Sequence, residues 1–147
     1  GQQSARFDWY LNGTRITAKG RYLMPREWGR ETFYTFMPRE RNEGYGDLTA
    51  ITVNTYFKPE KNIKLELSGG YFQLPDVKNF ALNKYGMPTY SQLNLGITYQ
   101  FDKYLKGLNA LLLVVRKDEI GETYQNDRFV FNKVNMKHLN LIINYHY

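Results

Sequence analysis

The chain has no cysteine, only two histidines and no long uninterrupted run of apolar residues. Without cysteine there is no disulfide, no thiolate nucleophile and no cysteine-ligated metal site. A transmembrane helix needs about 20 predominantly apolar residues in a row, and no segment approaches that length. His138 and His146 are eight positions apart on one face of a predicted strand, too far apart to ligate one metal ion together. A helical membrane protein is therefore excluded, and no metal site is expected.

Motifs for catalysis and for nucleic-acid binding are also missing. There is no Ser-His-acid grouping in a recognisable motif, no glycine-rich phosphate loop and no zinc-ligand spacing. No RNA-binding signature accompanies the basic residues. We therefore expect no catalytic residue, no cofactor and no nucleic-acid partner.

Aromatic residues are plentiful at 16%, including 13 Tyr, whereas the mean hydropathy is only −0.59. The last ten residues, HLNLIINYHY, show how a chain rich in aromatic residues can have a low mean hydropathy, because apolar residues fill every second position. Leu139, Leu141, Ile143, Tyr145 and Tyr147 would share one face of a strand, and polar side chains most of the other. A terminal strand ending on an aromatic resembles the closing strand of bacterial outer-membrane β-barrels. The alternative is an edge strand of a soluble β-sandwich.

Five earlier segments alternate in the same way, 4–11, 15–22, 48–58, 63–72 and 93–101, and a sixth strand is predicted at 108–116. Asn12-Gly13 predicts a type I′ hairpin turn between the first two. The connections alternate in length, short at 12–13, 59–62 and 102–107 and long at 24–47, 73–90 and 117–133. Outer-membrane barrels have short periplasmic turns at one rim and long loops at the other. The sequence thus predicts an all-β, transmembrane, antiparallel up-and-down β-barrel, with residues 1–147 in a single domain.

The predicted strand number, seven, is odd. Single-chain bacterial barrels close with an even number of strands. We therefore expect the chain to be the C-terminal part of a larger barrel, with the earlier strands in a preceding portion or a companion chain. The alternative is an eight-stranded barrel whose first strand is misread.

The net charge is +6 and the isoelectric point about 9.4. If the apolar face meets lipid, five cations and two anions face the lumen: Arg6, Asp8, Arg15, Lys19, Arg21, Lys64 and Glu66. Arg15 to Arg21 would form a row about 14 Å long down the pore. Rows of Arg and Lys select anions, so this interpretation predicts an anion path. The alternative is that these charges only solvate a water-filled lumen.

Residues 26–47, REWGRETFYTFMPRERNEGYGD, resemble the W-G-R…F-x-T-F-x-P-R-E-R-N-E-G-x-G-D signature of OprD-like outer-membrane porins, Bacteroidetes branch. The later Gly-Glu-Thr-Tyr at 121–124 and the terminal strand are similar too, so the resemblance covers roughly residues 14–147. It implies a barrel of about 18 strands in the outer membrane of a Gram-negative bacterium. It also implies inward-folded loops that narrow a channel with a basic ladder for small carboxylate-bearing solutes.

The loop that carries this signature holds the candidate constriction residues Arg26, Arg30, Arg39 and Arg41. Their guanidinium groups could bind a solute carboxylate, or could form a salt-bridged plug with Glu40, Glu43 and Asp47. Residues 111–115, LLLVV, are apolar on both faces of the sixth predicted strand. One face would meet lipid, so an infolded loop or a neighbouring subunit must cover the other.

The expected function is passive diffusion of small, anionic or carboxylate-bearing solutes through an outer-membrane channel. The expected partners are the lipid bilayer, the solutes and the outer-membrane assembly machinery, with Ile143, Tyr145 and Tyr147 as the assembly signal. The alternative is a structural or interaction barrel that anchors a cell-surface assembly and whose lumen is sealed by its loops.

Overall fold

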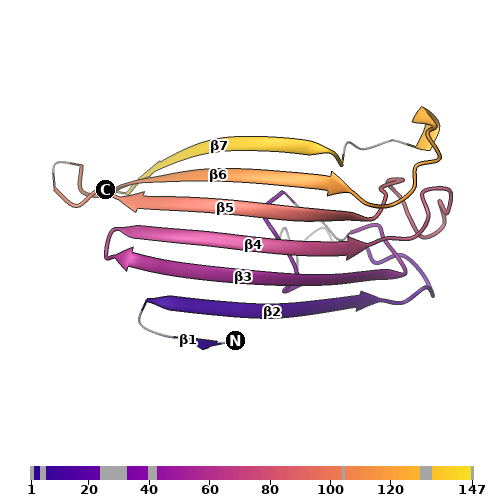
Figure 1. The fold of residues 1–147 in the computed structure, drawn as a ribbon, viewed down its shortest axis with the longest axis horizontal. Helices are drawn as coiled ribbons and strands as arrows, with labels where there is room; N and C mark the ends of the chain where they lie inside the picture. Colours follow the sequence, from indigo (N-terminus) through magenta and orange to yellow (C-terminus); the bar gives the residue numbers. More distant parts are fainter. Residues whose placement is uncertain are drawn as a thin grey trace.

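The computed structural model describes residues 2–3, 6–23, 33–39, 43–103, 105–129 and 134–146. One antiparallel sheet holds all strands of these residues (Figure 1). The strands are β1 Gln2–Gln3, β2 Phe7–Ile16, β3 Leu48–Glu60, β4 Ile63–Gln73, β5 Tyr90–Gln100, β6 Leu108–Glu119 and β7 Met136–Tyr145. A short 3₁₀ helix, η2, covers Asp127–Phe129. In this part of the chain no helix is both long and apolar enough to span a bilayer.

Each strand pairs with the next one in sequence, so the sheet runs β1 to β7 without a crossover. This confirms the all-β, antiparallel up-and-down prediction. The sheet is open, with β1 and β2 at one edge and β7 at the other (Figure 1).

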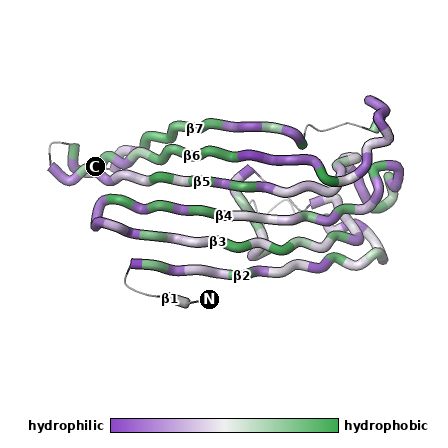
Figure 2. The backbone as a smooth tube through the Cα atoms, in the orientation of Figure 1, coloured by the Kyte–Doolittle hydropathy of each residue, from purple (hydrophilic) through white to green (hydrophobic). Residues whose placement is uncertain are grey.

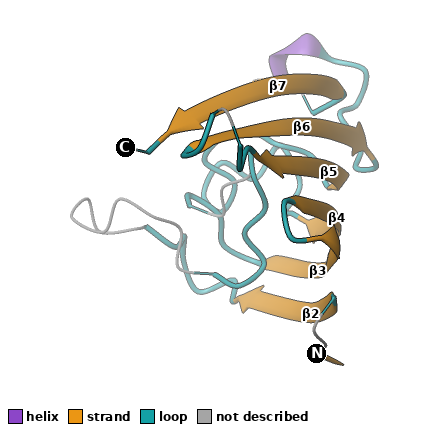
Figure 3. Ribbon diagram, turned by 90° about the vertical axis from the view of Figure 1, so that its left-hand side faces the viewer, coloured by secondary structure: helices purple, strands orange, loops and turns teal. Residues whose placement is uncertain are grey.

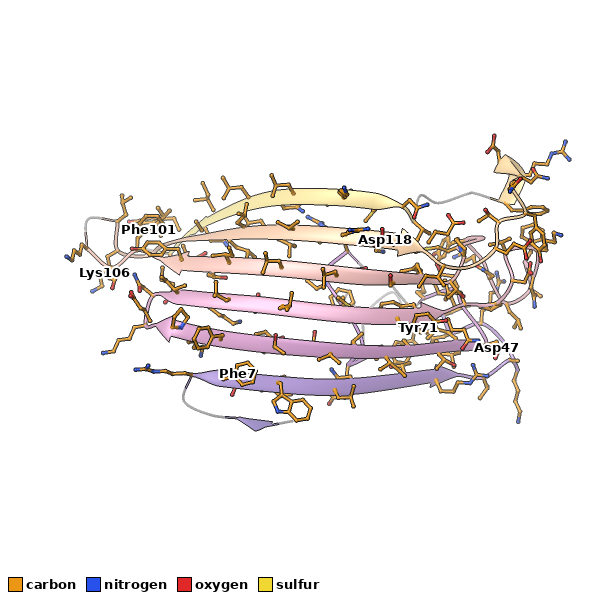
Figure 4. All side chains as sticks on the ribbon, viewed as in Figure 1. Phe7, Asp47, Tyr71, Phe101, Lys106 and Asp118 are labelled. Atoms are coloured by element: carbon orange, nitrogen blue, oxygen red, sulfur yellow. The ribbon has the colours of Figure 1, made fainter. Side chains whose placement is uncertain are left out.

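The connections alternate in length as predicted. Long loops at 17–47, 74–89 and 120–135 lie at one end of the sheet, and short turns at 61–62 and 101–107 at the other (Figure 1). Figure 4 shows Phe7, Phe101 and Lys106 at the short-turn end, and Asp47, Tyr71 and Asp118 at the long-loop end.

The predicted hairpin at Asn12-Gly13 is wrong. Both residues lie inside β2, where Asn12 pairs with Thr52 and Gly13 with Ile51. Asn-Gly permits a tight turn but does not require one, and β3 offers backbone partners along the whole of β2. The predicted return strand 15–22 is also wrong, because Ala18 to Gly20 form a turn. The sheet therefore has six long strands, with the two-residue β1 beside them, rather than seven of similar length.

The sheet is curved, and the first and second long loops fold toward its concave side (Figure 3). The strand register places most apolar side chains on the convex face, including Leu11, Val53, Leu67, Leu95 and Leu112. β6 and β7 are hydrophobic toward their short-turn ends and hydrophilic toward the long loops (Figure 2). Most strands thus present one apolar and one largely polar face, as their alternating sequences predict, whereas Leu111 to Val115 make β6 apolar on both faces.

A small apolar core forms where the long loops meet the concave face. Its buried members are Met37, Tyr45, Leu48, Ala50, Phe72, Leu74, Tyr90 and Val134. The rings of Phe72 and Tyr90 stack with centroids 4.9 Å apart. A Cβ at Gly70 would lie 2.7 Å from Met37 Sδ, so glycine at this position leaves room for the loop to reach the sheet. The core therefore fixes the loops to one end of the sheet.

Candidate functional site

The concave face carries rows of polar side chains across neighbouring strands. Asn54, Ser68 and Asn94 share one register row, and Tyr56 and Glu66 share the next toward the short turns. Partners in an antiparallel register point to the same side of a sheet, so these groups form one continuous polar surface. This surface is the candidate functional site.

Residues 33–39 of the first long loop lie across this face (Figure 3). Thr35 and Thr14 share a hydroxyl hydrogen bond of 2.8 Å, which fixes the loop to β2. The side-chain amides of Gln92 and Asn94 both donate to the Pro38 carbonyl, at 2.8 and 3.2 Å. These bonds hold the loop between β2 and β5.

Arg39 extends this anchorage to the last strand. One guanidinium N–H donates to Asn140 Oδ1 on β7 at 2.8 Å, and Arg39 has a positive φ of 69°. Of the predicted constriction residues, only Arg39 lies within the described residues. Arg26, Arg30 and Arg41 lie outside them.

Residues 33–39, here called the infolded loop, also lie over part of the apolar concave side of β6. Leu113 and Val115 are buried there. Phe36 and Pro38 line a pocket of roughly 120 Å³ together with Leu113. The infolded loop therefore covers the concave face of β6 near Leu113. The other lining residues are Asn54, Tyr56, Glu66, Ser68, Asn94 and Gly96.

Lys64 and Glu66 lie on the concave face and pair with each other. Lys64 Nζ is 2.5 Å from a Glu66 carboxylate oxygen and 4.8 Å from the centre of the Tyr56 ring. Opposite charges at this distance largely cancel at longer range. Glu66 therefore offsets part of the attraction that Lys64 would exert on an anion.

A second pocket, of about 240 Å³, opens at the short-turn end of the sheet. It is lined by Lys58, Lys61, Asn62, Ile63, Lys64, Thr98 and Gln100. Neither Lys58 nor Lys61 was predicted as a site residue, because Lys58 ends the predicted strand 48–58 and Lys61 lies in the predicted turn 59–62. The three-residue spacing of lysines in KPEKNIK, around so short a turn, was the available signal.

Arg15 does not lie on the concave face, so its predicted position is wrong. It pairs with Thr49 in the register and shares the convex face with Leu11. Its guanidinium forms a salt bridge with Asp47 and donates to Thr49 Oγ1 at 3.1 Å. The prediction assumed a turn at Asn12-Gly13, and an uninterrupted β2 carries Arg15 to the opposite face.

The predicted row from Arg15 to Arg21 is wrong for the same reason. Lys19 and Arg21 are exposed in the loop after β2, not on a strand. Arg6 precedes β2, and its carbonyl accepts a hydrogen bond of 2.9 Å from the Lys58 N–H. Its backbone therefore lies beside the lysine-lined pocket.

The predicted assembly-signal residues end the last strand. Ile143 pairs with Ala110 and Tyr145 with Leu108, and both side chains are exposed on the convex face. Tyr147 lies outside the described residues.

A contact joins the second and third long loops at the long-loop end of the sheet. The Tyr124 hydroxyl donates to an Asp76 carboxylate oxygen, and Lys78 Nζ lies 3.3 Å from the centre of the Tyr124 ring. The Tyr124 bond, then the Lys78 backbone N–H, lower the pKa of Asp76. The same hydroxyl bond, more than any other cause, raises the pKa of Tyr124. This contact favours ionised Asp76 and neutral Tyr124.

Among the described residues, no group of three or more His, Asp or Glu side chains could hold a metal ion. Comparison with known proteins found no matching family model, curated protein or solved structure.

Proposed function

We propose that this chain is part of the wall of an OprD-like outer-membrane porin, in which the concave face lines a channel for small anionic or carboxylate-bearing solutes. The observation that carries the proposal is the exposure of apolar side chains over most of the convex face, from β2 to β7. Leu139 is 73% exposed and Leu141 66%, and similar residues extend to Leu11 on β2. Soluble monomers rarely expose contiguous apolar patches larger than a few hundred Å².

The dimensions of the strands support a bilayer as the environment. A transmembrane β-strand needs about 9–11 residues, and β2 to β7 have between 10 and 13. Phe7, Phe57, Tyr99 and Tyr145 lie on the convex face near the short turns. Aromatic residues at that level are typical of the girdle at a membrane interface.

An open sheet edge is not viable within the hydrocarbon layer, because its N–H and C=O groups would lack partners. The proposal therefore includes closure into a larger barrel, of about 18 strands if the family resemblance holds. The additional strands come from a preceding portion of the protein or a companion chain. The short turns then face the periplasm.

The charges of the concave face favour anions as solutes. Lys58 and Lys64 lie at its short-turn end, beside Arg6, and Arg39 lies on the infolded loop. Asp8 and Glu66 are the nearby carboxylates on β2 and β4, and Glu66 already pairs with Lys64. Basic pore linings attract anions while holding them weakly enough to leave.

A sealed barrel that anchors a surface assembly is the second candidate, and one observation favours it. Residues 33–39 cover much of the concave face, and the pocket left beneath Pro38 is only about 120 Å³. In this alternative the infolded loop is a plug rather than a constriction.

Planar-bilayer recording of the full-length protein separates the two. A porin should give stable open channels, and the reversal potential in a salt gradient should show a preference for anions. In a Gln92→Ala/Asn94→Ala variant, which loses both bonds to the Pro38 carbonyl, single-channel conductance should rise. Correctly folded protein that stays silent in both forms contradicts the channel and supports the sealed barrel.

A further inference from the structure

The lysine-lined pocket at the short-turn end differs chemically from the rest of the concave face. Three of its lining residues, Lys58, Lys61 and Lys64, are cationic, and no carboxylate is among its described lining residues. Thr98 adds a hydroxyl, and Asn62 and Gln100 add amide groups. Ammonium, hydroxyl and amide N–H groups all donate hydrogen bonds to oxyanions.

The hairpin between β3 and β4 gathers these lysines. Lys58 lies near the end of β3, Lys61 in the two-residue turn and Lys64 near the start of β4. A register irregularity between Phe57 and Glu60 interrupts the regular pairing there. Irregularities of this kind re-aim side chains at the ends of strands. The pocket thus combines residues of this turn with the regularly paired Lys64 and Thr98.

Among the described residues, the positive charge of the pocket is only partly compensated. Lys64 pairs with Glu66, whereas Lys58 and Lys61 are in no ion pair among the described residues. Lysines that share one pocket repel each other, and an anion with several charges relieves more of that repulsion than a monovalent one. The volume, about 240 Å³, lies below the ~300–1,000 Å³ of typical pockets for drug-sized ligands. A small anion therefore suits it.

We propose that this pocket is a binding site for a small multivalent oxyanion, of the phosphate, pyrophosphate or di- and tricarboxylate class. Lys58 and Lys61 supply the charge, and Lys64, Thr98 and Gln100 orient the oxyanion. A role of this site in binding a transported solute rests on the proposed function. The site would lie at the short-turn end of the channel.

The position of the pocket favours a soluble anion over a lipid headgroup. Lys64 and Thr98 are register partners on the concave face, opposite the apolar convex face. A headgroup would instead approach from the convex side, where the acyl chains would lie. A soluble phosphate and a lipid phosphate share the same chemistry, so the experiment has an arm for each.

The test is calorimetric titration of the folded full-length protein, in detergent micelles, with inorganic pyrophosphate. The Lys58→Gln/Lys61→Gln variant should bind pyrophosphate about tenfold more weakly than the wild type. The matched control is Lys103→Gln/Lys106→Gln, which removes equal charge from the other short turn, where Figure 4 labels Lys106. The control should stay within about twofold of the wild type, and all binding should weaken as salt is added.

Three results overturn the site: no pyrophosphate binding by the wild type, equal losses in both double variants, or displacement of pyrophosphate by phosphatidylglycerol in the micelle. The last result would assign the pocket to lipid. If the Lys58→Gln/Lys61→Gln variant fails to fold, Lys61→Gln alone, at an exposed turn position, should still weaken binding about threefold.

An anion-selective channel that binds no pyrophosphate would overturn this inference and leave the proposed function intact. Pyrophosphate binding to a folded barrel that never conducts would overturn the proposed channel and leave the anion site intact.

Discussion

At the scale of single residues, two neighbouring glycines on β4 have opposite surroundings. A Cβ at Gly70 would lie 2.6 Å from the Phe72 ring and 2.7 Å from Met37 Sδ, whereas one at Gly69 would meet nothing within 4 Å. The lack of a side chain at Gly70 therefore leaves room for the infolded loop to pack. At Gly69 no neighbouring group needs that room.

Gly70→Ala should destabilise the folded protein by about 1–3 kcal/mol, because the added methyl overpacks the contact with Met37. Gly69→Ala is the matched control and should leave stability unchanged or slightly raised, since alanine loses less entropy on folding. Thermal unfolding followed by heat-modifiable gel mobility measures both. Equal effects of the two substitutions would mean that Met37 does not pack against Gly70.

The contact between Asp76 and Tyr124 predicts a pH window for the loop end of the sheet. The pKa of Asp76 is lowered, so its stabilising effect is present above the ordinary value of 3.8 and is lost as pH falls through the lower folded value. The pKa of Tyr124 is raised, so its effect is present below 10.0 and is lost as pH rises through the higher folded value. Both groups are exposed, so the free energy involved is small.

Tyr124→Phe should raise the pKa of Asp76 toward its ordinary value, because the Tyr124 hydroxyl is the largest cause of the shift. Carboxyl ¹³C chemical shifts of Asp76 across a pH titration measure this. Tyr34→Phe, at a largely exposed tyrosine in another loop, is the control and should change nothing. An Asp76 pKa that is the same in wild type and Tyr124→Phe would exclude the hydrogen bond as its cause.

At the scale of elements, β7 tests the assignment of the two faces. Leu141 and Ile143 lie on the convex face, and Asn144 is on the concave face, where its amide donates to Asn109 Oδ1 at 3.2 Å. Arginine on the lipid face of a barrel costs about 2–4 kcal/mol at the midplane and less near the rim. Leu141→Arg and Ile143→Arg should therefore reduce the folded fraction much more than Asn144→Arg, as judged by heat-modifiable mobility. Equal damage from Asn144→Arg and Ile143→Arg would show a strand buried on both faces.

The elements that the sequence predicted well are those with an unbroken alternation. β3, β4, β5 and β7 alternate with period two over most of their length, and their faces and order follow from that pattern alone. β2 was mispredicted because Asn12-Gly13 is a strong local turn signal. Pairing with β3, which follows after a connection of about 30 residues, overrides it. A long-range partner of this kind is not visible in a local window.

The candidate site was predictable only where regular strands carry it. The alternation of β4 predicts the face on which Lys64 and Glu66 lie. The pocket that Lys64 shares with Lys58 depends in addition on a pairing irregularity. The anchors of the infolded loop, such as Gln92 to the Pro38 carbonyl, join residues more than 50 positions apart. No local pattern encodes such contacts, since they depend on how the loop folds back over the sheet.

At the scale of the whole molecule, the apolar and polar surfaces lie on opposite sides of one curved sheet. The first and second long loops fold onto the concave side and leave the convex side of six strands uncovered by the rest of the described chain (Figure 3). Burial of apolar surface stabilises by about 25 cal/mol per Å², so an uncovered face of this kind favours an apolar environment. Under the proposed function, lipid lies on the convex side of the sheet and water on the concave side.

Fluorescence of Trp9 tests this claim most directly, because Trp9 lies on the convex face of β2 between Phe7 and Leu11. Trp28→Phe leaves it as the one tryptophan, since the chain contains two. In vesicles of brominated lipid its emission should be blue-shifted and strongly quenched. A tryptophan at Tyr10, on the concave face, in a Trp9→Phe/Trp28→Phe background should be quenched by aqueous iodide instead. The opposite pattern, with Trp9 quenched by iodide and untouched by brominated lipid, would contradict the assignment of the convex face to the membrane.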